Sequence, residues 1–354
     1  MKVLLICKEY YTNKSLLEDK FGRLYHLPVG LTKLGMDVSV IALDYRSKEE
    51  KSKIYENTTF QTLLFKPHIL IKNIKELYQL THSIKPDIII ASGDSHIGFI
   101  SLKISKTLRC RFIFDVYDYY PAFKSNKIPG MSYLFWLTVK QADTIICASE
   151  PLKEKLIKDN TNTYVILNGV DTSIFRPMDK MKARQNIHLD AETGPIVGYF
   201  GSITKNRFPI LIDACRLLKI NYPMIKILIA GKNTDIDLKN EIFIYLGELT
   251  QEEIPILINS CDVVTIPYLN EDFNNYCGAC KIPEYLACQV PIVATDVSNH
   301  RDFFSIQTYS ITKPNPKDFA TAIANQIKNP YIDNFNENFT WEKISQKLHR
   351  IIIT

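Results

Sequence analysis

Residues 195–201 read Pro-Ile-Val-Gly-Tyr-Phe-Gly, an apolar run closed by a glycine, and a helical pattern starts soon after it, near Pro209. A short, fully apolar run followed by a helical pattern is typical of a buried parallel strand in a βαβ unit. The same alternation already fills the first 170 residues, beginning with the run Val3–Cys7. Because the pattern starts twice, the sequence predicts an α/β protein of two Rossmann-like, doubly wound modules.

Each module is expected to alternate strands with helices. The expected strands of the first module are Val3–Cys7, Val38–Leu43, Thr59–Phe65, Asp87–Ala91, Arg111–Asp115, Thr144–Ala148 and Tyr164–Leu167. Those of the second are Pro195–Gly201, Ile225–Ala230, Ile242–Leu246, Val263–Pro267 and Ile292–Ala294, with Thr308–Ile311 as a further candidate. Expected helices include Leu24–Leu34, Ile71–Ser83, Leu134–Ala142, Pro151–Lys158, Pro209–Ile220, Glu252–Ser260, Ile282–Cys288, Asp318–Lys328 and Trp341–Ile353. The charged segment Phe175–Glu192 is predicted to be the linker.

Composition and the cysteines favour a folded protein of the cytoplasm. Hydrophobic residues make up 46% of the chain and charged residues 23%, which excludes a mostly disordered protein. The first apolar run meets Lys8 and Glu9 at once, so it fits a buried strand better than a signal peptide. Several of the 8 cysteines lie in apolar runs, as thiols of a reducing compartment do. The spacing Cys277-x-x-Cys280 has no second Cys or His pair, so structural thiols are expected there and no metal site.

Charge is distributed unevenly along the chain. Residues 1–170 hold 24 Lys and Arg against 17 Asp and Glu, whereas residues 171–354 hold 19 against 21. A basic first half suits an anionic partner, such as a phospholipid surface or a lipid-diphosphate acceptor, and a merely solvated basic face explains it equally well. Peripheral contact with the inner face of the cell membrane is a further expectation, supported by the apolar stretch Pro129–Trp136. Packing of a helix into the core explains that stretch about equally well.

The loop after the strand at residues 195–201 is the first candidate site, because ligands of open α/β sheets bind beyond the carboxyl ends of the strands. It contains Gly201, Ser202, Lys205 and Arg207, and a helix follows. Backbone N–H groups at a helix start, with cations beside them, suit a diphosphate. The alternative is a tight turn with solvated cations.

The second candidate is the helix start around Lys281 and Glu284. Gly278, Ala279 and Cys280 precede it and offer uncrowded backbone for phosphate or sugar oxygens. The Glu284 carboxylate could accept hydrogen bonds from both hydroxyls of a nucleotide ribose. By itself, however, a glutamate in the first turn of a helix is more often a surface residue favoured by the helix dipole.

Two further candidate sites follow strands of the first module. Residues 114–121 read FDVYDYYP and place Asp118 and Tyr119 where a buried strand ends, so they favour a ligand or catalytic role over capping of a turn. Residues 92–96 read SGDSH and include Asp94; a plain turn is slightly favoured over a cleft lining here. The motifs G-x-G-x-x-G, H-E-x-x-H, G-x-S-x-G and Walker A are absent.

Several segments, in order along nearly the whole chain, resemble retaining glycosyltransferases of the GT-B fold, family 4. Residues 168–177 (NGVDTSIFRP) are similar to the hinge segment of that family, and residues 198–207 (GYFGSITKNR) to the opening of its donor domain. ADTIICASEPLKEKL, PDIIIASG and KIPEYLACQVPIVATD resemble its other strands and its donor-site helix. Residues 23–38 resemble its first helix, and Phe339–Trp341 the start of its terminal helix.

The resemblance implies an architecture and an activity. Two Rossmann-like domains would face a cleft, with an acceptor-side domain at 1–176, a nucleotide-sugar donor domain at 177–338 and a crossover helix at 339–354 that packs back on the first domain. The enzyme would be a hexosyl or related transferase that moves a sugar from a nucleoside diphosphate to a hydroxyl acceptor, such as a lipid-linked or cell-surface polysaccharide precursor.

The resemblance also implies roles for particular residues. Lys205 or Arg207 would bind the diphosphate, Glu284 the ribose, and Gly278–Cys280 the sugar or its phosphate. Asp118 lies where the family has a residue facing the transferred sugar, so Asp118, Lys205 and Arg207 are the catalytic candidates. With Lys281, the two cations would neutralise the leaving diphosphate. No cofactor and no metal are expected, and the departing phosphate would deprotonate the acceptor, with retention of anomeric configuration.

The sequence departs from the family in two places. Tyr276 occupies the position of a first glutamate, as in a branch that carries a lysine at the position of Lys281. The Gly-Gly pair usual after the first strand is missing, and Gly22-Arg23 is a substitute. The acceptor-side candidates are therefore Gly22, Arg23, Asp94 and Tyr119.

Three rival interpretations stay open. A nucleotide-sugar 2-epimerase has a similar double-Rossmann shape, and Tyr276 motivates a non-catalytic sugar-nucleotide-binding subunit. Nucleic-acid binding through the basic half lacks any recognisable RNA- or DNA-reading motif.

Overall fold

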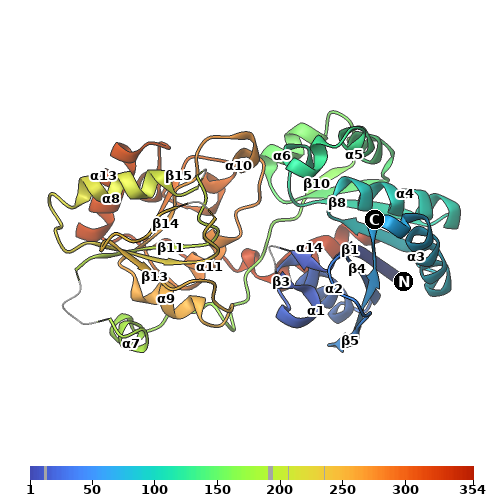
Figure 1. The fold of residues 1–354 in the computed structure, drawn as a ribbon, viewed down its shortest axis with the longest axis horizontal. Coiled ribbons are helices and arrows are strands. Elements are labelled where there is room, and N and C mark those ends of the chain that lie inside the picture. The colour runs from blue at the N-terminus through green and yellow to red at the C-terminus, as the bar shows by residue number, and fades with distance from the viewer. Residues whose placement is uncertain (12–13, 190–193, 206, 235) are drawn as a thin grey trace. The chain divides into compact units, whose positions relative to one another are not determined.

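The computed structural model describes residues 1–11, 14–189, 194–205, 207–234 and 236–354. The chain forms two compact units (Figure 1). The first unit comprises Met1–Gly169, Tyr276–Gly278 and Asn338–Thr354, and the second comprises Val170–Asn275 and Ala279–Glu337. Each unit is an α/β structure around its own sheet, as the repeated sequence pattern predicts.

The sheet of the first unit has the strand order β10-β9-β8-β7-β1-β4-β6-β5. Every pairing is parallel except that between β5 and β6. Strand order reverses between β1 and β7, so the carboxyl ends of these strands form a topological switch point, where open α/β sheets bind ligands. The strands are β1 (Lys2–Lys8), β4 (Asp37–Asp44), β5 (Ser52–Tyr55), β6 (Thr58–Leu64), β7 (Ile88–Ser92), β8 (Arg111–Val116), β9 (Thr144–Cys147) and β10 (Thr163–Val165).

Helices connect these strands, and the last helix of the chain joins them. The helices are α2 (Arg23–Lys33), α3 (Leu70–Ile84), α4 (Ser95–Leu108), α5 (Met131–Gln141), α6 (Glu150–Leu156) and α14 (Trp341–Ile353), with short 3₁₀ turns η1 (Pro67–Ile69), η2 (Tyr120–Ala122), η3 (Lys124–Lys127) and η5 (Glu337–Phe339).

Helix α14 returns to the first unit, as predicted, and packs on α2 (Figure 1). A methyl group on Gly30 of α2 would lie 2.0 Å from the Ser345 Oγ of α14, so only glycine allows this close approach. Arg111 donates hydrogen bonds to the carbonyl oxygens of Ile352 (2.9 Å) and Ile351 (3.3 Å) at the end of the helix. Both contacts join residues that are remote in sequence.

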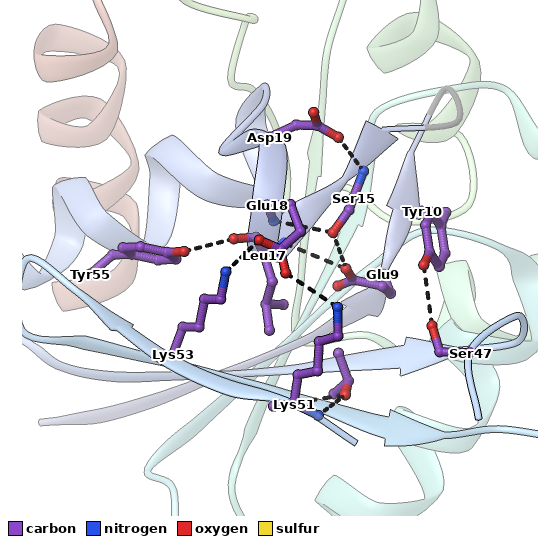
Figure 2. A network of polar contacts seen from close by, with 11 residues as sticks. Glu9, Tyr10, Ser15, Leu17, Glu18, Asp19, Ser47, Lys51, Lys53 and Tyr55 are labelled. Carbon is purple, nitrogen blue, oxygen red and sulfur yellow. Dashed lines mark hydrogen bonds and ion pairs between the residues drawn. The ribbon is translucent and has the colours of Figure 1, made fainter. Parts of the chain in front are cut away.

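A polar network fastens the segment that follows β1 (Figure 2). This segment contains β2 (Tyr10–Tyr11), β3 (Lys14–Ser15) and the single turn α1 (Leu16–Asp19). Buried Glu9 accepts a hydrogen bond from the Ser15 hydroxyl at 2.5 Å, and that hydroxyl accepts one from the Glu18 N–H. Lys51 and Lys53 form ion pairs with Glu18. These contacts therefore fasten β3 and α1 within the first unit.

The second unit has a parallel sheet in the order β13-β12-β11-β14-β15-β16, with its switch point between β11 and β14. The strands are β11 (Ile196–Phe200), β12 (Lys226–Ala230), β13 (Phe243–Tyr245), β14 (Val263–Ile266), β15 (Ile292–Thr295) and β16 (Ile311–Thr312). The helices are α7 (Lys180–Asn186), α8 (Pro209–Leu218), α9 (Ile254–Ser260), α10 (Asp272–Asn275), α11 (Lys281–Ala287), α12 (Gln307–Ser310) and α13 (Pro316–Lys328), with the 3₁₀ turn η4 (His300–Phe303).

Two expectations about elements were wrong. The predicted strand Thr308–Ile311 is mostly helix α12, and the short strand β16 follows it. The predicted linker Phe175–Glu192 contains helix α7, while its residues 190–192 lie outside the described ranges. Arg184 of α7 is buried because it donates hydrogen bonds to the carbonyl oxygen of Ser260 and to the carboxylate of Asp262. These bonds attach α7 to the second unit.

Among the helices in the described ranges, none is both long enough and apolar enough to span a bilayer.

Candidate functional site

Two glycine loops meet at the carboxyl edge of the second sheet. Gly201 follows β11 with φ 155°, and Gly231 follows β12 with φ 134°. A methyl group on Gly231 would lie 2.2 Å from the Gly201 carbonyl oxygen, so a side chain at residue 231 would push the loops apart. A methyl group on Gly201 would lie 2.7 Å from Nζ of Lys281. The predicted phosphate loop thus lies directly against the lysine of the predicted donor helix.

Lys281 is held as a cation at this edge. Its ammonium donates a hydrogen bond to the Tyr268 hydroxyl at 3.4 Å. Burial, the largest effect, and the nearby Arg207 act to lower the pKa of Lys281, whereas Tyr268, Cys280 and Tyr199 act to raise it, and the pKa is raised overall.

Arg207 supplies a second cation at the same place. Its guanidinium carbon lies 4.6 Å from the centroid of the Tyr268 ring and 5.0 Å from that of Phe273. Its Nε donates to the Asn274 side-chain oxygen at 3.3 Å. Lys205, two residues earlier, is exposed. The structure therefore places Gly201 against Lys281, and Lys281 and Arg207 against the same tyrosine.

The start of helix α8 offers an anion fewer backbone N–H donors than the sequence suggested. Pro209, its first residue, has no N–H group. The N–H groups of Leu211 and Ile212 already donate to the Phe208 carbonyl oxygen. Ser202 is exposed, and its carbonyl oxygen accepts a hydrogen bond from the Tyr199 hydroxyl at 2.7 Å. Side-chain cations thus have to provide most of the positive potential.

Glu284 and the residues before α11 divide between the two units. Glu284 is half-buried one turn after Lys281, so the two side chains share a face of α11. Ala279 is buried in the second unit, and the half-buried Cys280 precedes the helix. Gly278 belongs to the first unit, where a methyl group on it would lie 2.8 Å from the Ala148 side chain. Gly278 thus packs against Ala148 within the first unit.

His300, which sequence analysis did not select, is buried behind Tyr268. Its ring centroid lies 5.6 Å from that of Tyr268. Nδ1 lies 2.8 Å from the Thr295 carbonyl oxygen, which can only accept, so Nδ1 carries the proton. Nε2 is buried without a hydrogen-bond partner. Burial lowers the pKa of His300 to about 4, so the ring is neutral at physiological pH.

In the first unit, Arg23 is an internal residue. Its Nε and Nη2 donate to the two carboxylate oxygens of Asp115 at 3.1 and 2.7 Å, and Nη1 donates to Ile166 and Asn168. Burial raises the pKa of Asp115, while Arg23 and the Ser92 hydroxyl oppose this shift. These contacts favour a structural role for Arg23 in place of the expected contact with an acceptor. Gly22, just before it, has φ 68° and precedes α2.

The other acceptor-side candidates lie at the carboxyl edge of the first sheet. Asp94 precedes α4 and forms an ion pair with Lys8 of β1 at 3.6 Å. Asp118 and Tyr119 follow β8 and are half-buried. The Lys155 ammonium lies 4.8 Å from the centre of the Tyr119 ring. Ser92 ends β7 and Ser95 begins α4, so Asp94 lies in the short bend between the strand and the helix.

The cysteines and other metal-binding residue types do not form a metal centre in the described part of the chain. No group of three His, Cys, Asp or Glu side chains there could hold an ion. None of the eight cysteines forms a disulfide bond.

Sequence analysis missed Tyr268, Phe273 and Asn274 as partners of the cations. Tyr268 is the second residue after β14, so the rule that ligands gather beyond strand ends could have selected it. Its two cationic partners are Arg207, about 60 residues before it, and Lys281, 13 residues after it at the start of α11, and only the fold joins them.

Comparison with known families decides the identity of the chain. Residues 23–174 match the family described as Glycosyltransferase Family 4, and residues 194–329 match Glycosyl transferases group 1. The chain is a family 4 glycosyltransferase. No curated protein matches this glycosyltransferase in a sequence search.

Solved structures similar to this glycosyltransferase show the GT-B fold along its whole length. HepE from Anabaena in complex with UDP has a TM-score of 0.75 at 17% identity and covers 100% of both chains. Sucrose-phosphate synthase from Thermosynechococcus elongatus has a TM-score of 0.73 at 14% identity, covering 100% of this chain and 98% of its own. UDP-GlcNAc 2-epimerase from Methanocaldococcus jannaschii has a TM-score of 0.60 at 12% identity, covering 100% and 99%. At these identities the likeness concerns the fold alone.

Proposed function

We propose that this glycosyltransferase takes its sugar from a nucleoside diphosphate sugar bound at the carboxyl edge of the second sheet. The observation that carries the proposal is the pair of cations, Arg207 and Lys281, both held on Tyr268 beside the glycine loop at Gly201. Two cations held at one place suit an anionic ligand, and a diphosphate supplies matching negative charge. HepE, which shares the fold, was solved with UDP and with UDP-glucose, which supports this class of donor.

Each site residue then has a chemical task. Negative charge develops on the diphosphate as the glycosidic bond breaks, and Arg207, Lys281 and the exposed Lys205 stabilise that charge. Glu284, one turn along α11 from Lys281, accepts hydrogen bonds from the ribose hydroxyls. Asp118 of the first unit is the proposed catalytic carboxylate. Transfer proceeds with retention of configuration and without a metal cofactor.

The acceptor is a hydroxyl of a lipid-linked or cell-surface polysaccharide precursor, bound by the first unit. The basic charge of residues 1–170 supports binding of an anionic carrier lipid. In and next to the apolar stretch Pro129–Trp136, Ile128 and Tyr133 are 60% and 68% exposed, which supports contact with a membrane. The neighbouring Phe135 is fully buried, so only part of this stretch is available to a membrane. Co-sedimentation with anionic vesicles at low and high salt tests the contact, and absence of the protein from the pellet at low salt would exclude it.

The donor site is tested by binding and turnover. Among UDP, GDP, ADP, dTDP and CMP, one nucleotide should raise the melting temperature of the wild-type protein most, because a ligand that binds only the native state stabilises it. Lys281→Ala and Glu284→Ala should each weaken its binding about 10- to 100-fold, the effect of losing a charged hydrogen bond. Lys328→Ala, which removes an exposed lysine at the end of α13, should bind normally.

Turnover separates the transferase from its rivals. The wild-type protein should release the nucleoside diphosphate from its sugar donor, and addition of a suitable acceptor should accelerate release. Binding without any turnover would indicate a non-catalytic subunit, and epimerised donor without acceptor would indicate a 2-epimerase. Activity abolished by EDTA and restored by Mg²⁺ would overturn the metal-free mechanism, and an inverted anomeric proton coupling in the NMR spectrum of the product would overturn retention.

A further inference from the structure

Tyr268 contacts three ionisable side chains through different parts of itself. Its ring face lies against the Arg207 guanidinium, its hydroxyl accepts from Lys281, and its ring approaches His300. Only 5% of the residue is exposed. The tyrosine therefore joins both candidate diphosphate-binding cations within the second unit.

The backbone of Tyr268 is fixed from the neighbouring strand. The Thr295 hydroxyl, at the end of β15, donates to the Tyr268 carbonyl oxygen at 2.8 Å. The Thr295 carbonyl accepts the His300 Nδ1 proton. One residue thus anchors both the tyrosine and the ring behind it, which leaves Tyr268 little freedom to move.

Holding two cations near each other before an anion arrives is unfavourable. Arg207 acts to lower the pKa of Lys281, as expected for two positive charges that repel each other. Long cationic side chains also lose rotamer freedom when they are fixed, which is unfavourable. The ring attracts the guanidinium by a cation–π contact, and the hydroxyl attracts the ammonium, so both costs are offset before ligand binds. His300, being neutral, adds no third positive charge.

We propose that Tyr268 is a positioning residue that holds Arg207 on its ring and Lys281 on its hydroxyl, ready for the donor diphosphate. This inference rests on the proposed function. It assigns the ring of Tyr268 to Arg207 and its hydroxyl to Lys281, so mutations can remove the two contacts separately.

Two variants separate ring from hydroxyl. Tyr268→Phe keeps the ring and removes the acceptor for Lys281, so affinity for the nucleoside diphosphate selected above should fall about 3- to 10-fold. Tyr268→Leu removes both contacts, and affinity should fall about 30-fold or more. Affinity for the corresponding nucleoside, which lacks phosphate, should stay unchanged in both. Tyr309→Phe, at a half-exposed tyrosine of the same unit, is the matched control and should bind as the wild type does.

A double-mutant cycle tests whether the hydroxyl acts through Lys281. Tyr268→Phe combined with Lys281→Met should bind no worse than Lys281→Met alone, whereas its combination with Lys205→Met should give additive losses. Equal losses for nucleoside and diphosphate, or additivity with Lys281→Met, would overturn the positioning role. A wild-type protein that binds no diphosphate would instead contradict the proposed function itself. If Tyr268→Leu fails to fold, Tyr268→Phe and the cycle still decide.

Discussion

At the scale of single residues, burial decides what the titratable groups can do. His300 has its folded-state pKa lowered from 6.5 to about 4, because burial disfavours the imidazolium. The unfolded chain therefore binds more protons than the folded chain between these two pH values. This difference in proton binding lowers the free energy of unfolding. The decrease is absent above pH 6.5, grows as the pH falls below 6.5, and is complete below pH 4.

The resulting prediction concerns acid stability. Between pH 7 and pH 5, protonation of His300 in the unfolded state should cost the wild-type protein about 2 kcal/mol. His300→Gln keeps an N–H donor for the Thr295 carbonyl but does not titrate, so it should lose less stability over the same interval. Calorimetry at both pH values compares the two proteins. A stability difference that does not change with pH would show that His300 is not buried as a neutral ring.

Residue roles were harder to predict than residue places. The loops that carry Gly201, Lys281 and Asp118 could be placed at strand ends from the apolar runs alone. The role of Arg23 could not be predicted, because its partner Asp115 is 92 residues away and only the packed sheet brings the two side chains together. Tyr268 and His300 were missed for the same reason: their neighbours come from other strand ends.

At the scale of elements, buried parallel strands could be predicted and edge elements could not. A central strand such as β8 is almost fully buried and reads as an apolar run. The edge strand β5 has only exposed and half-buried residues, so no such run marks it. Helix α7 has a charged sequence, and its pairing with Asp262 is invisible until β14 is in place.

Helix α14 provides the prediction at this scale. Arg111→Ala removes the donor to the carbonyl groups of Ile351 and Ile352, and should destabilise the first unit by about 1–3 kcal/mol. Lys347→Ala, at an exposed position of the same helix, should change stability by less than about 0.5 kcal/mol. Both tryptophans, Trp136 and Trp341, belong to the first unit, so their fluorescence during urea unfolding reports on it. Equal effects of the two substitutions would show that the hydrogen bonds from Arg111 to the end of α14 do not stabilise the first unit.

At the scale of the whole molecule, the first unit is discontinuous in sequence. Its sheet is complete by residue 165, yet α14, which packs on α2, comes from the last residues of the chain. The repeated apolar pattern predicts two sheets, and the resemblance of Phe339–Trp341 to a terminal helix predicted the return of the chain. Neither could predict the glycine-to-serine contact that fits α14 to α2.

This order of assembly has a consequence during synthesis. The ribosome makes α14 only after the second unit, so the surface around Gly30 stays uncovered while residues 166–340 are being translated. A product that stops before residue 341 would display that surface permanently, and quality-control proteases would recognise it by its exposed apolar side chains.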